Sequence, residues 1–229
     1  MSIAEKLTQI AENEQKVFEA GRKDYYNEFW DVFQGNGERK NYSYAFAYSW
    51  NDISFKPKHN MIPTKCDSMF NSCTISDIAK SLEKSGVYLD TSQSTGMNYM
   101  FGGNYSLVRV PPISVESCSA PAGIFGWCSV ETIDKFILRA DGTNTFNDTF
   151  TYASNLKNIT IEGVIGNNIS FQHSTVLSKA SIENIVAHLS DTASGKTLSL
   201  SQTAVNNAFT DAEWTALADT KKNWTISLL

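Results

Sequence analysis

The sequence of 229 residues lacks any hydrophobic run approaching the roughly 18 residues that a membrane-spanning helix needs. It also lacks a secretory signal at its start, because polar and charged residues interrupt the apolar stretch between Ile3 and Ile10. We therefore expect a protein that is made in a cytosol and is not exported by the general secretory route. Action outside the cell would then follow lysis.

Positive charge is also scarce, since 19 Lys and Arg residues stand against 24 Asp and Glu residues, and the formal net charge is −5. Nucleic-acid binding needs clustered lysine and arginine, whereas the basic runs here are pairs and no more. The composition thus argues against nucleic acid as a partner. Hydrophobic residues make up 41% and charged residues 19% of the chain, which is typical of an ordered domain with a core.

Histidine and cysteine are too few and too scattered to indicate a metal site. The three histidines have no ligand partner at metal-binding spacing. The four cysteines match no zinc or redox motif, and we predict that they are small buried apolar residues: Cys66, Cys73, Cys118 and Cys128. No catalytic, cofactor-binding or metal-binding residue is predicted. An enzyme with an unrecognised site is left as an alternative.

What the chain does contain is a phenylalanine at nearly regular intervals through its middle. Phe46, Phe70, Phe101, Phe125 and Phe150 are separated by 24, 31, 24 and 25 residues. Self-similarity at about 20 to 50 residues indicates stacked repeats, each of which buries its apolar face against its neighbours. We therefore predict that the five rings point into one shared interior. Coincidentally spaced core aromatics are the alternative.

The residues around three of these phenylalanines share a Phe-x-x-Cys or Phe-x-x-Ala motif, in the segments 69–73, 124–128 and 149–153. This pattern resembles leucine-rich repeats of the BspA-like type, which run to about 23 residues. The Phe101 unit departs from it, with Asn104 at the small position. The resemblance implies an α/β solenoid: a short irregular leucine-rich-repeat array with an N-terminal helical segment and a C-terminal α/β cap.

A second resemblance lies in segments 177–182, 203–209 and 223–228, and in the start of the chain over 1–7. These segments are similar to the closure and the start of repeat proteins encoded in phage and prophage genomes of gut Firmicutes. Such proteins are usually tail, baseplate or fibre components. The resemblance therefore implies a virion protein that is made in the bacterial host cytoplasm.

Four segments are predicted along the chain. An N-terminal helix over 1–20 serves oligomerisation or attachment, and an aromatic capping helix follows over 21–40. The repeat array covers 41–190 and the C-terminal cap covers 191–229. Within the last two segments we expect helices at 76–85 and 181–189, strands at 198–201 and 224–228, and a helix opened by a capping box at 210–213 that buries Trp214 and Leu217.

Two sets of residues are candidates for contacts with partners. Apolar residues at helical spacing form a candidate oligomerisation seam: Ile3, Leu7, Ile10 and Val17. The alternative is a helix that docks on its own repeats. Aromatic residues near the repeat motifs are the candidate ligand contacts, with core packing as the alternative reading: Tyr48, Trp50, Tyr105, Trp127 and Tyr152.

The sequence thus predicts a non-enzymatic phage virion component, a tail-, baseplate- or fibre-associated adhesin or receptor-binding protein. It would present its repeat surface to the host envelope. The expected partners are a host cell-surface glycan or protein and other virion proteins, in a homo-oligomer for which a trimer is one form. The alternative is an intracellular protein–protein interaction module, a phage protein that binds a host defence or regulatory protein.

Overall fold

The computed structural model describes residues 40–48, 55 and 57–229. The predicted helix over 1–20 and nearly all of the predicted capping helix over 21–40 lie outside them. The strands are β1 (Lys40–Asn41), β2 (Pro63–Lys65), β3 (Arg109–Val110), β4 (Ile113–Ser114), β5 (Thr132–Ile137), β6 (Asn158–Glu162), β7 (Ile169–Phe171), β8 (Lys196–Leu200) and β9 (Trp224–Leu228). The helices are α2 (Ile78–Ser85), α3 (Lys179–Ala187), α4 (Gln202–Ala208), α5 (Asp211–Ala218) and the 3₁₀ turn η2 (Asp219–Lys221).

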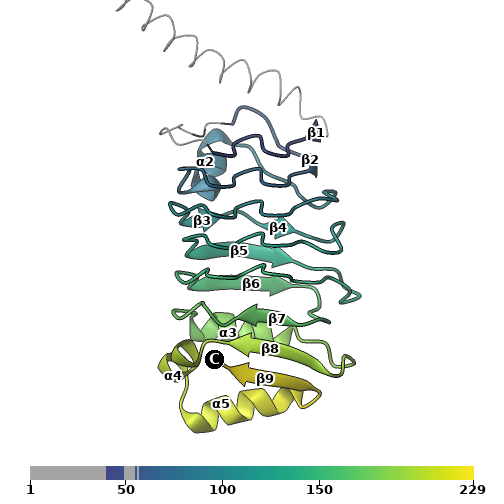
Figure 1. Ribbon diagram of the computed structural model, residues 1–229, viewed down its shortest axis with the longest axis vertical. Coiled ribbons are helices and arrows are strands. Elements are labelled where there is room, and N and C mark those ends of the chain that lie inside the picture. The colour runs from purple at the N-terminus through teal and green to yellow at the C-terminus, as the bar shows by residue number, and fades with distance from the viewer. Residues whose placement is uncertain (1–39, 49–54, 56) are drawn as a thin grey trace, which may run out of the picture.

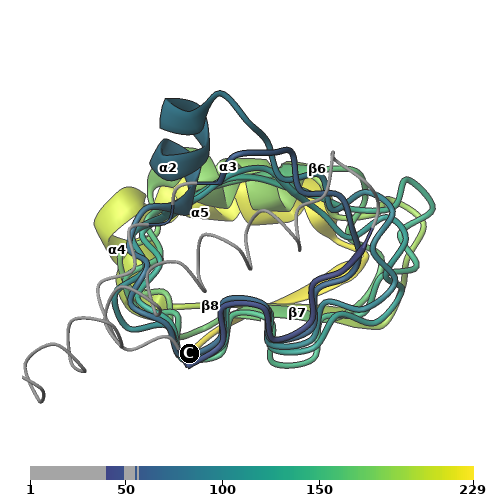
Figure 2. The ribbon, with the colours of Figure 1, turned by 90° about the horizontal axis from the view of Figure 1, so that it is seen from above.

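All strand pairs in the described residues are parallel, and they fall into three small sheets. One holds β1 and β2, the second holds β3, β4, β5 and β6, and the third has the order β7–β8–β9. Viewed along the long axis, the chain traces a flattened oval, with β6 and α3 on one long side and β7 and β8 on the other (Figure 2).

The predicted architecture, an α/β solenoid formed by a leucine-rich-repeat array, is therefore wrong. The three sheets are separate and do not curl into one wound sheet, and four α-helices accompany them in the described residues. The physical reason lies in the backbone. The segments that carry the periodic phenylalanines are successive turns with left-handed residues, and a strand cannot continue through such residues.

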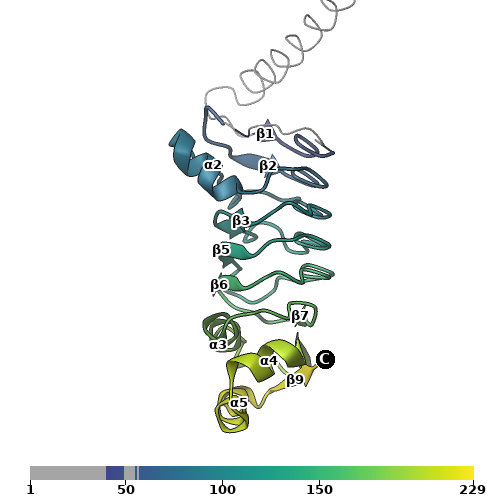
Figure 3. The same cartoon turned by 90° about the vertical axis from the view of Figure 1, so that its left-hand side faces the viewer.

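Successive segments of chain nevertheless lie one above another as layers (Figures 1 and 3). Backbone hydrogen bonds join neighbouring layers: Phe46 N–H donates to the Met69 carbonyl at 2.8 Å, and Phe125 N–H donates to the Thr149 carbonyl at 2.9 Å. Phe70 and Phe101 make equivalent bonds of 2.7 and 2.9 Å to the layer that follows each. The turns are thus held together across layers as the strands of a sheet would be.

The prediction that the five periodic rings share one interior is confirmed. From Phe46 to Phe150 each ring stacks on the next, with centroids 5.1, 5.5, 5.4 and 5.6 Å apart. A sixth ring, Phe171, continues the stack at 4.4 Å from Phe150. All six rings are buried. Below them, Leu200 pairs in register with Phe171, and Leu228 pairs with Leu200, so aliphatic residues occupy the equivalent place in the next two layers.

The 31-residue interval before Phe101 accommodates α2, which lies outside the oval (Figure 2). Asp77 caps this helix by accepting a hydrogen bond from Lys80 N–H at 2.8 Å, and Gly86 ends it with φ 65°. Its apolar residues Ile78 and Leu82 are buried. The insertion therefore adds a helix to the side of the stack without displacing the ring that follows.

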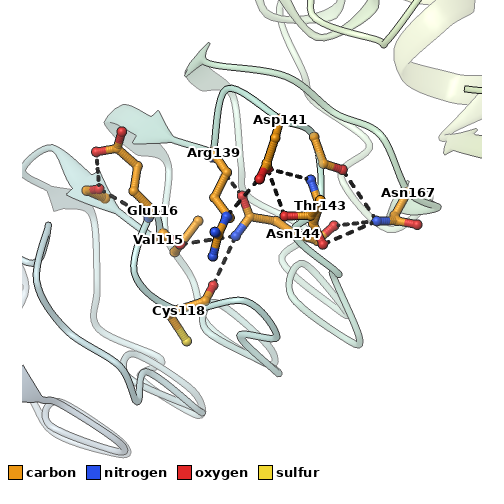
Figure 4. A network of polar contacts seen from close by, with 10 residues as sticks. Val115, Glu116, Cys118, Arg139, Asp141, Thr143, Asn144 and Asn167 are labelled. Carbon is orange, nitrogen blue, oxygen red and sulfur yellow. Dashed lines mark hydrogen bonds and ion pairs between the residues drawn. The ribbon is translucent and has the colours of Figure 1, made fainter. Parts of the chain in front are cut away.

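Buried asparagines hold neighbouring layers together at two places. Asn104, which departs from the small-residue pattern, donates through Nδ2 to the Ile75 carbonyl at 3.3 Å and to Cys73 Sγ at 3.2 Å. Asn144 donates to the carbonyls of Val115 and Cys118, both at 3.0 Å, and its Oδ1 accepts from Arg139 N–H (Figure 4). Such side chains satisfy carbonyls that the broken strands leave without ladder partners.

Asn167 repeats this arrangement one layer further along. Its Nδ2 donates to the Asn144 carbonyl at 3.0 Å (Figure 4), while its Oδ1 accepts from Lys196 Nζ. Helix α3 closes the edge of β6 in a similar way. Ile159 N–H donates to Ser181 Oγ at 3.0 Å, and Ile161 N–H donates to the side chain of Asn184 at 2.6 Å. These polar contacts end the second sheet, since an unpaired strand edge would otherwise remain.

The C-terminal elements agree with several predictions. Helix α3, strand β8 and strand β9 lie where helical and strand patterns were expected. The capping box is confirmed: Glu213 N–H donates to Thr210 Oγ1, and Thr210 N–H donates to the carboxylate of Glu213. Trp214 and Leu217, however, are only partly buried, because α5 packs at the end of the stack with no further layer described beyond it.

Removing one of the stacked phenylalanine rings should lower the stability of the protein strongly. Replacing Phe125 with alanine removes a ring that contacts Phe101, Phe136 and Phe150, and should lower the free energy of unfolding by about 3–5 kcal/mol. Denaturant unfolding of the purified chain measures this. Tyr105→Ala, at a side chain 74% exposed, is the matched control and should change stability by no more than about 0.5 kcal/mol. If Phe125→Ala lowers the free energy of unfolding by less than about 1 kcal/mol, the stabilising role assigned to the stacked rings is contradicted.

Candidate binding surface

The left-handed residues recur at fixed places in each layer. Positive φ values between 50° and 65° occur two residues before the stacked phenylalanine, at Tyr44, Ser68, Tyr99, Gly123 and Asp148. They occur again two residues after it, at Tyr48, Ser72, Gly103, Trp127 and Tyr152. Layers therefore share a zigzag backbone, and equivalent side chains lie in register from layer to layer.

Interlayer hydrogen bonding explains why this conformation is needed. Trp127 N–H donates to the Thr151 carbonyl at 2.7 Å, and Tyr48 N–H donates to the Asn71 carbonyl at 2.9 Å. The left-handed turn aims these N–H groups along the stack while the intervening phenylalanine points inwards. As a result, the side chains two residues after each phenylalanine point away from the core, and those of Tyr48, Trp127 and Tyr152 are 59%, 39% and 56% exposed.

Three of these outward side chains form a continuous line of rings, which we call the ring row: Trp127, Tyr152 and His173. The Trp127 and Tyr152 ring centroids lie 6.0 Å apart. The Tyr152 and His173 rings stack at 4.2 Å with an interplanar angle of 19°. His173 follows Phe171 by two residues, so it occupies the same place in the next layer. The ring row thus runs along the stack across three layers.

The structure brings only two of the five predicted ligand contacts together. Trp127 and Tyr152 belong to the ring row, whereas Tyr48 is separated from it by the layers of Ser72 and Gly103. Tyr105 is 74% exposed but lies four residues after Phe101, outside the two series of left-handed positions. Trp50 lies outside the described residues, as do the predicted oligomerisation residues Ile3, Leu7, Ile10 and Val17.

One residue of the ring row was not predicted from the sequence. His173 could have been found from Phe171-Gln172-His173-Ser174, which repeats the motif with serine at the small position, 21 residues after Phe150. Tyr99 is 41% exposed, and its ring lies across Gly123. A Cβ at Gly123 would stand 2.5 Å from the ring carbon Cε1, so the close approach of this ring is what favours glycine there. The positive φ alone does not, because Ser68 and Asp148 hold it at the equivalent place in other layers.

An open groove of about 510 Å³ lies on the layers of Tyr152 and His173 and the layer beyond them. Its polar lining consists of amide, hydroxyl and carboxylate side chains: Asn147, Asp148, Asn168, Ser170, Thr197 and Ser199. Asp148 is the one ionisable residue among those that line it. The groove therefore offers many hydrogen-bond donors and acceptors and little charge.

Other polar clusters in the described residues are accounted for by structural contacts. Arg109 donates from Nε and Nη2 to both carboxylate oxygens of Asp134 at 2.8 Å, and it pairs with Glu83 at 3.0 Å. This cluster ties α2 to β3 and β5. Within residues 40–48, 55 and 57–229, no group of three or more His, Cys, Asp or Glu side chains could hold a metal ion. None of the helices described there is long and apolar enough to cross a membrane.

The four cysteines are free and buried, as predicted. Burial raises the pKa of the Cys66 and Cys128 thiols to about 12 and that of Cys73 to about 11, and it also raises the pKa of Cys118. A thiol with a raised pKa carries little thiolate, the form that acts as a nucleophile or metal ligand. These residues therefore serve packing.

Comparison of the chain with protein-family models, with curated proteins and with solved structures found no match. The resemblance to BspA-like repeats and to phage-encoded proteins accordingly stays a prediction. What the fold and the surface define is a stack of short layers that carries a line of outward aromatic rings and a weakly charged polar groove.

Replacing Trp127 of the ring row with glycine should have little effect on stability. Trp127 has φ 55°, a conformation in which a bulky residue is strained, and glycine occupies the equivalent place as Gly103. Trp127→Gly should therefore change the free energy of unfolding by less than about 1 kcal/mol, or raise it, because relieved strain offsets the greater entropy of the unfolded chain. Denaturant unfolding measures this change.

Tyr105→Gly is the control, since Tyr105 is exposed and has no positive φ. That variant should lose about 0.4–1 kcal/mol through the unfolded state alone. Should Trp127→Gly instead lose more than about 2 kcal/mol, the Trp127 ring would have a packing role that its exposure does not indicate.

The raised pKa values of the buried thiols predict slow alkylation of the cysteines and a free energy of unfolding that depends on pH. At pH 8, Cys66 and Cys128 of the native chain should react with iodoacetamide on the order of 1,000-fold more slowly than in the unfolded chain, because little thiolate is present. The raised pKa values mean that the fold holds these protons more tightly than the unfolded chain does. The free energy of unfolding should thus fall as the pH rises above about 8.5. Mass spectrometry of labelled peptides follows each cysteine, and rapid native labelling of Cys66 or Cys128 would contradict the assignment.

Proposed function

We propose that this chain is a non-enzymatic binding protein of a phage virion, an adhesin or receptor-binding component that contacts the host envelope through the ring row. The observation that carries the binding role is the line of rings across three layers, in which Trp127 and Tyr152 are exposed and His173 is half-buried. Tryptophan and tyrosine supply large, rigid contact area and dominate binding energy at recognition surfaces. The expected partner is a host cell-surface glycan or protein.

The virion assignment is supported by sequence alone: the resemblance of residues 1–7, 177–182, 203–209 and 223–228 to phage-encoded tail and fibre proteins. A homo-oligomer formed through residues 1–20 belongs to the same proposal. Several copies of one weak surface on a particle would gain affinity by avidity without any new contact. The ring row lies within one chain, so it would be repeated once per subunit.

Two measurements test this proposal. Mass spectrometry of purified particles produced from the encoding genome should detect peptides of this chain at structural stoichiometry. Purified chain should also compete with those particles for adsorption to host cells, and Trp127→Ala with Tyr152→Ala should abolish that competition. Tyr105→Ala removes a more exposed aromatic side chain outside the ring row, and this variant should compete as the wild type does.

The same experiments address the alternative, an intracellular module that binds a host defence or regulatory protein. Absence of the chain from particles, together with its recovery from infected cytosol, would overturn the virion assignment and favour that alternative. Light scattering that shows a monomer at micromolar concentration would overturn the oligomeric part of the proposal.

A further inference from the structure

Strand β9 is the outermost strand of the third sheet, and it lies with α5 at the end of the stack (Figures 1 and 3). On one side it pairs with β8 in an unbroken register of five residues. Among the described residues, no strand or side chain bonds to the backbone of its other edge. An unpaired strand edge is a template for a further strand, so this edge is an interaction surface.

The hydrogen bonds of Leu229 show which backbone groups of β9 face this edge. The Leu229 N–H donates to the Leu200 carbonyl at 3.0 Å, and the Leu229 carbonyl accepts from Gln202 N–H at 2.9 Å. In a parallel pair, alternate residues of a strand bond to the same neighbouring strand. The residues two and four places before Leu229 therefore bond to β8 as well, whereas Ile226 and Leu228 direct their N–H and C=O groups away from it.

The side chains of the same two residues are incompletely covered. Leu198 and Leu200, which pair in register with Ile226 and Leu228, are fully buried because β9 lies next to them. Ile226 and Leu228 are themselves only partly buried. Helix α5 likewise has no buried residue, whereas α3 has four. The strand and the helix of the last layer thus both lack the cover that earlier elements receive.

Nothing in the sequence of β9 protects this edge from pairing. Strand edges that natural proteins leave in solvent are protected by lysine, proline or a bulge. Residues 224–228 include no charged residue and no proline, and their register with β8 has no bulge. The edge of β6, by contrast, is closed by the side chains of Ser181 and Asn184. An edge that is neither closed nor charged indicates a place for a partner.

The geometry of the last layer argues against a second copy of β9 as that partner. Two copies would pair antiparallel about an axis normal to the sheet, which keeps both α5 helices on the same side. The paired strands would lie about 4.8 Å apart, whereas packed helix axes need about 8–10 Å. Because α5 extends as far along the stack as β9, the two helices would overlap (Figures 1 and 3). The edge therefore suits a lone extended segment.

We infer that the free edge of β9 binds an extended segment of a partner protein, which adds a fourth strand to the third sheet. The register of that sheet defines the chemistry of the segment. From β7 to β9 the inward places hold isoleucine, leucine or phenylalanine, and the outward places hold serine and threonine. The segment should thus carry two apolar residues two places apart, with a small uncharged residue between them.

A peptide with the sequence of residues 196–201, Lys-Thr-Leu-Ser-Leu-Ser, has this alternation and is the probe. Titrated into the full chain, it should bind with a dissociation constant of about 1 mM or below. Hydrogen exchange followed by NMR locates the site. On binding, the amides of Ile226 and Leu228 should exchange about 10-fold more slowly or slower still, because they gain hydrogen bonds. The amides of Thr225 and Ser227, already bonded to β8, should not change.

Matched controls test the alternation and the backbone separately. The peptide Lys-Thr-Leu-Leu-Ser-Ser has the same composition without the alternation, and it should bind about 10-fold more weakly or not at all. Ile226→Pro removes the central outward N–H and should weaken binding of the first peptide about 10-fold, yet it should fold, because proline is tolerated where the N–H faces solvent. Ile226→Val keeps that N–H and should bind as the wild type does. If Ile226→Pro does not fold, Leu228→Lys places a charge at the edge and should weaken binding in the same way.

Three results would overturn the inference: no binding of the alternating peptide, equal binding of the two peptides, or binding without slower exchange at Ile226 and Leu228. A dimer that Ile226→Pro dissociates in sedimentation would also overturn it, because a second copy would then occupy the edge. The inference is independent of the proposed function, since β9 and the ring row are separate surfaces. Loss of adsorption in the Trp127 and Tyr152 variants therefore says nothing about β9, and Ile226→Pro should leave adsorption through the ring row intact.

Discussion

The stack of phenylalanine rings is the constraint on which the rest of this structure depends. Six rings from Phe46 to Phe171 lie in one column with centroids between 4.4 and 5.6 Å apart. That spacing is close to the separation of about 4.8 Å between hydrogen-bonded strands. Ring stacking and backbone hydrogen bonding therefore impose the same distance between layers, and each stabilises the geometry that the other needs.

This shared spacing explains how short turns replace strands on one side of the molecule. Each turn must send one side chain inwards and aim alternate N–H groups at the next layer, and left-handed residues two places before and after the phenylalanine satisfy both demands. The continuous sheet is lost in exchange, which is why the strands form three separate sheets. Asparagine side chains such as Asn104 and Asn144 supply the hydrogen bonds that the missing ladder would have made.

The core fixes where the outward side chains of each layer lie, but it does not fix which residue types occupy those places. The places two residues after each phenylalanine hold serine, glycine, tryptophan or tyrosine without a change in stacking. Residues there can therefore be chosen for contact with a ligand, at the expense of some backbone strain. The ring row of Trp127, Tyr152 and His173 is the place where such residues are consecutive.

The sequence by itself determined the inward column, because the intervals between phenylalanines record side-chain spacing directly. It also determined α2, α3, β8, β9 and the capping box of α5, whose signals are local periodicity and cap residues. Only the tertiary structure decided that the phenylalanine segments are left-handed turns and not strands of one wound sheet. Tryptophan and tyrosine at positive φ have no local signal, since hydrogen bonds from the adjacent layer impose that conformation. For the same reason the meeting of Trp127 and Tyr152 with His173 depends on register between layers, which no single segment encodes.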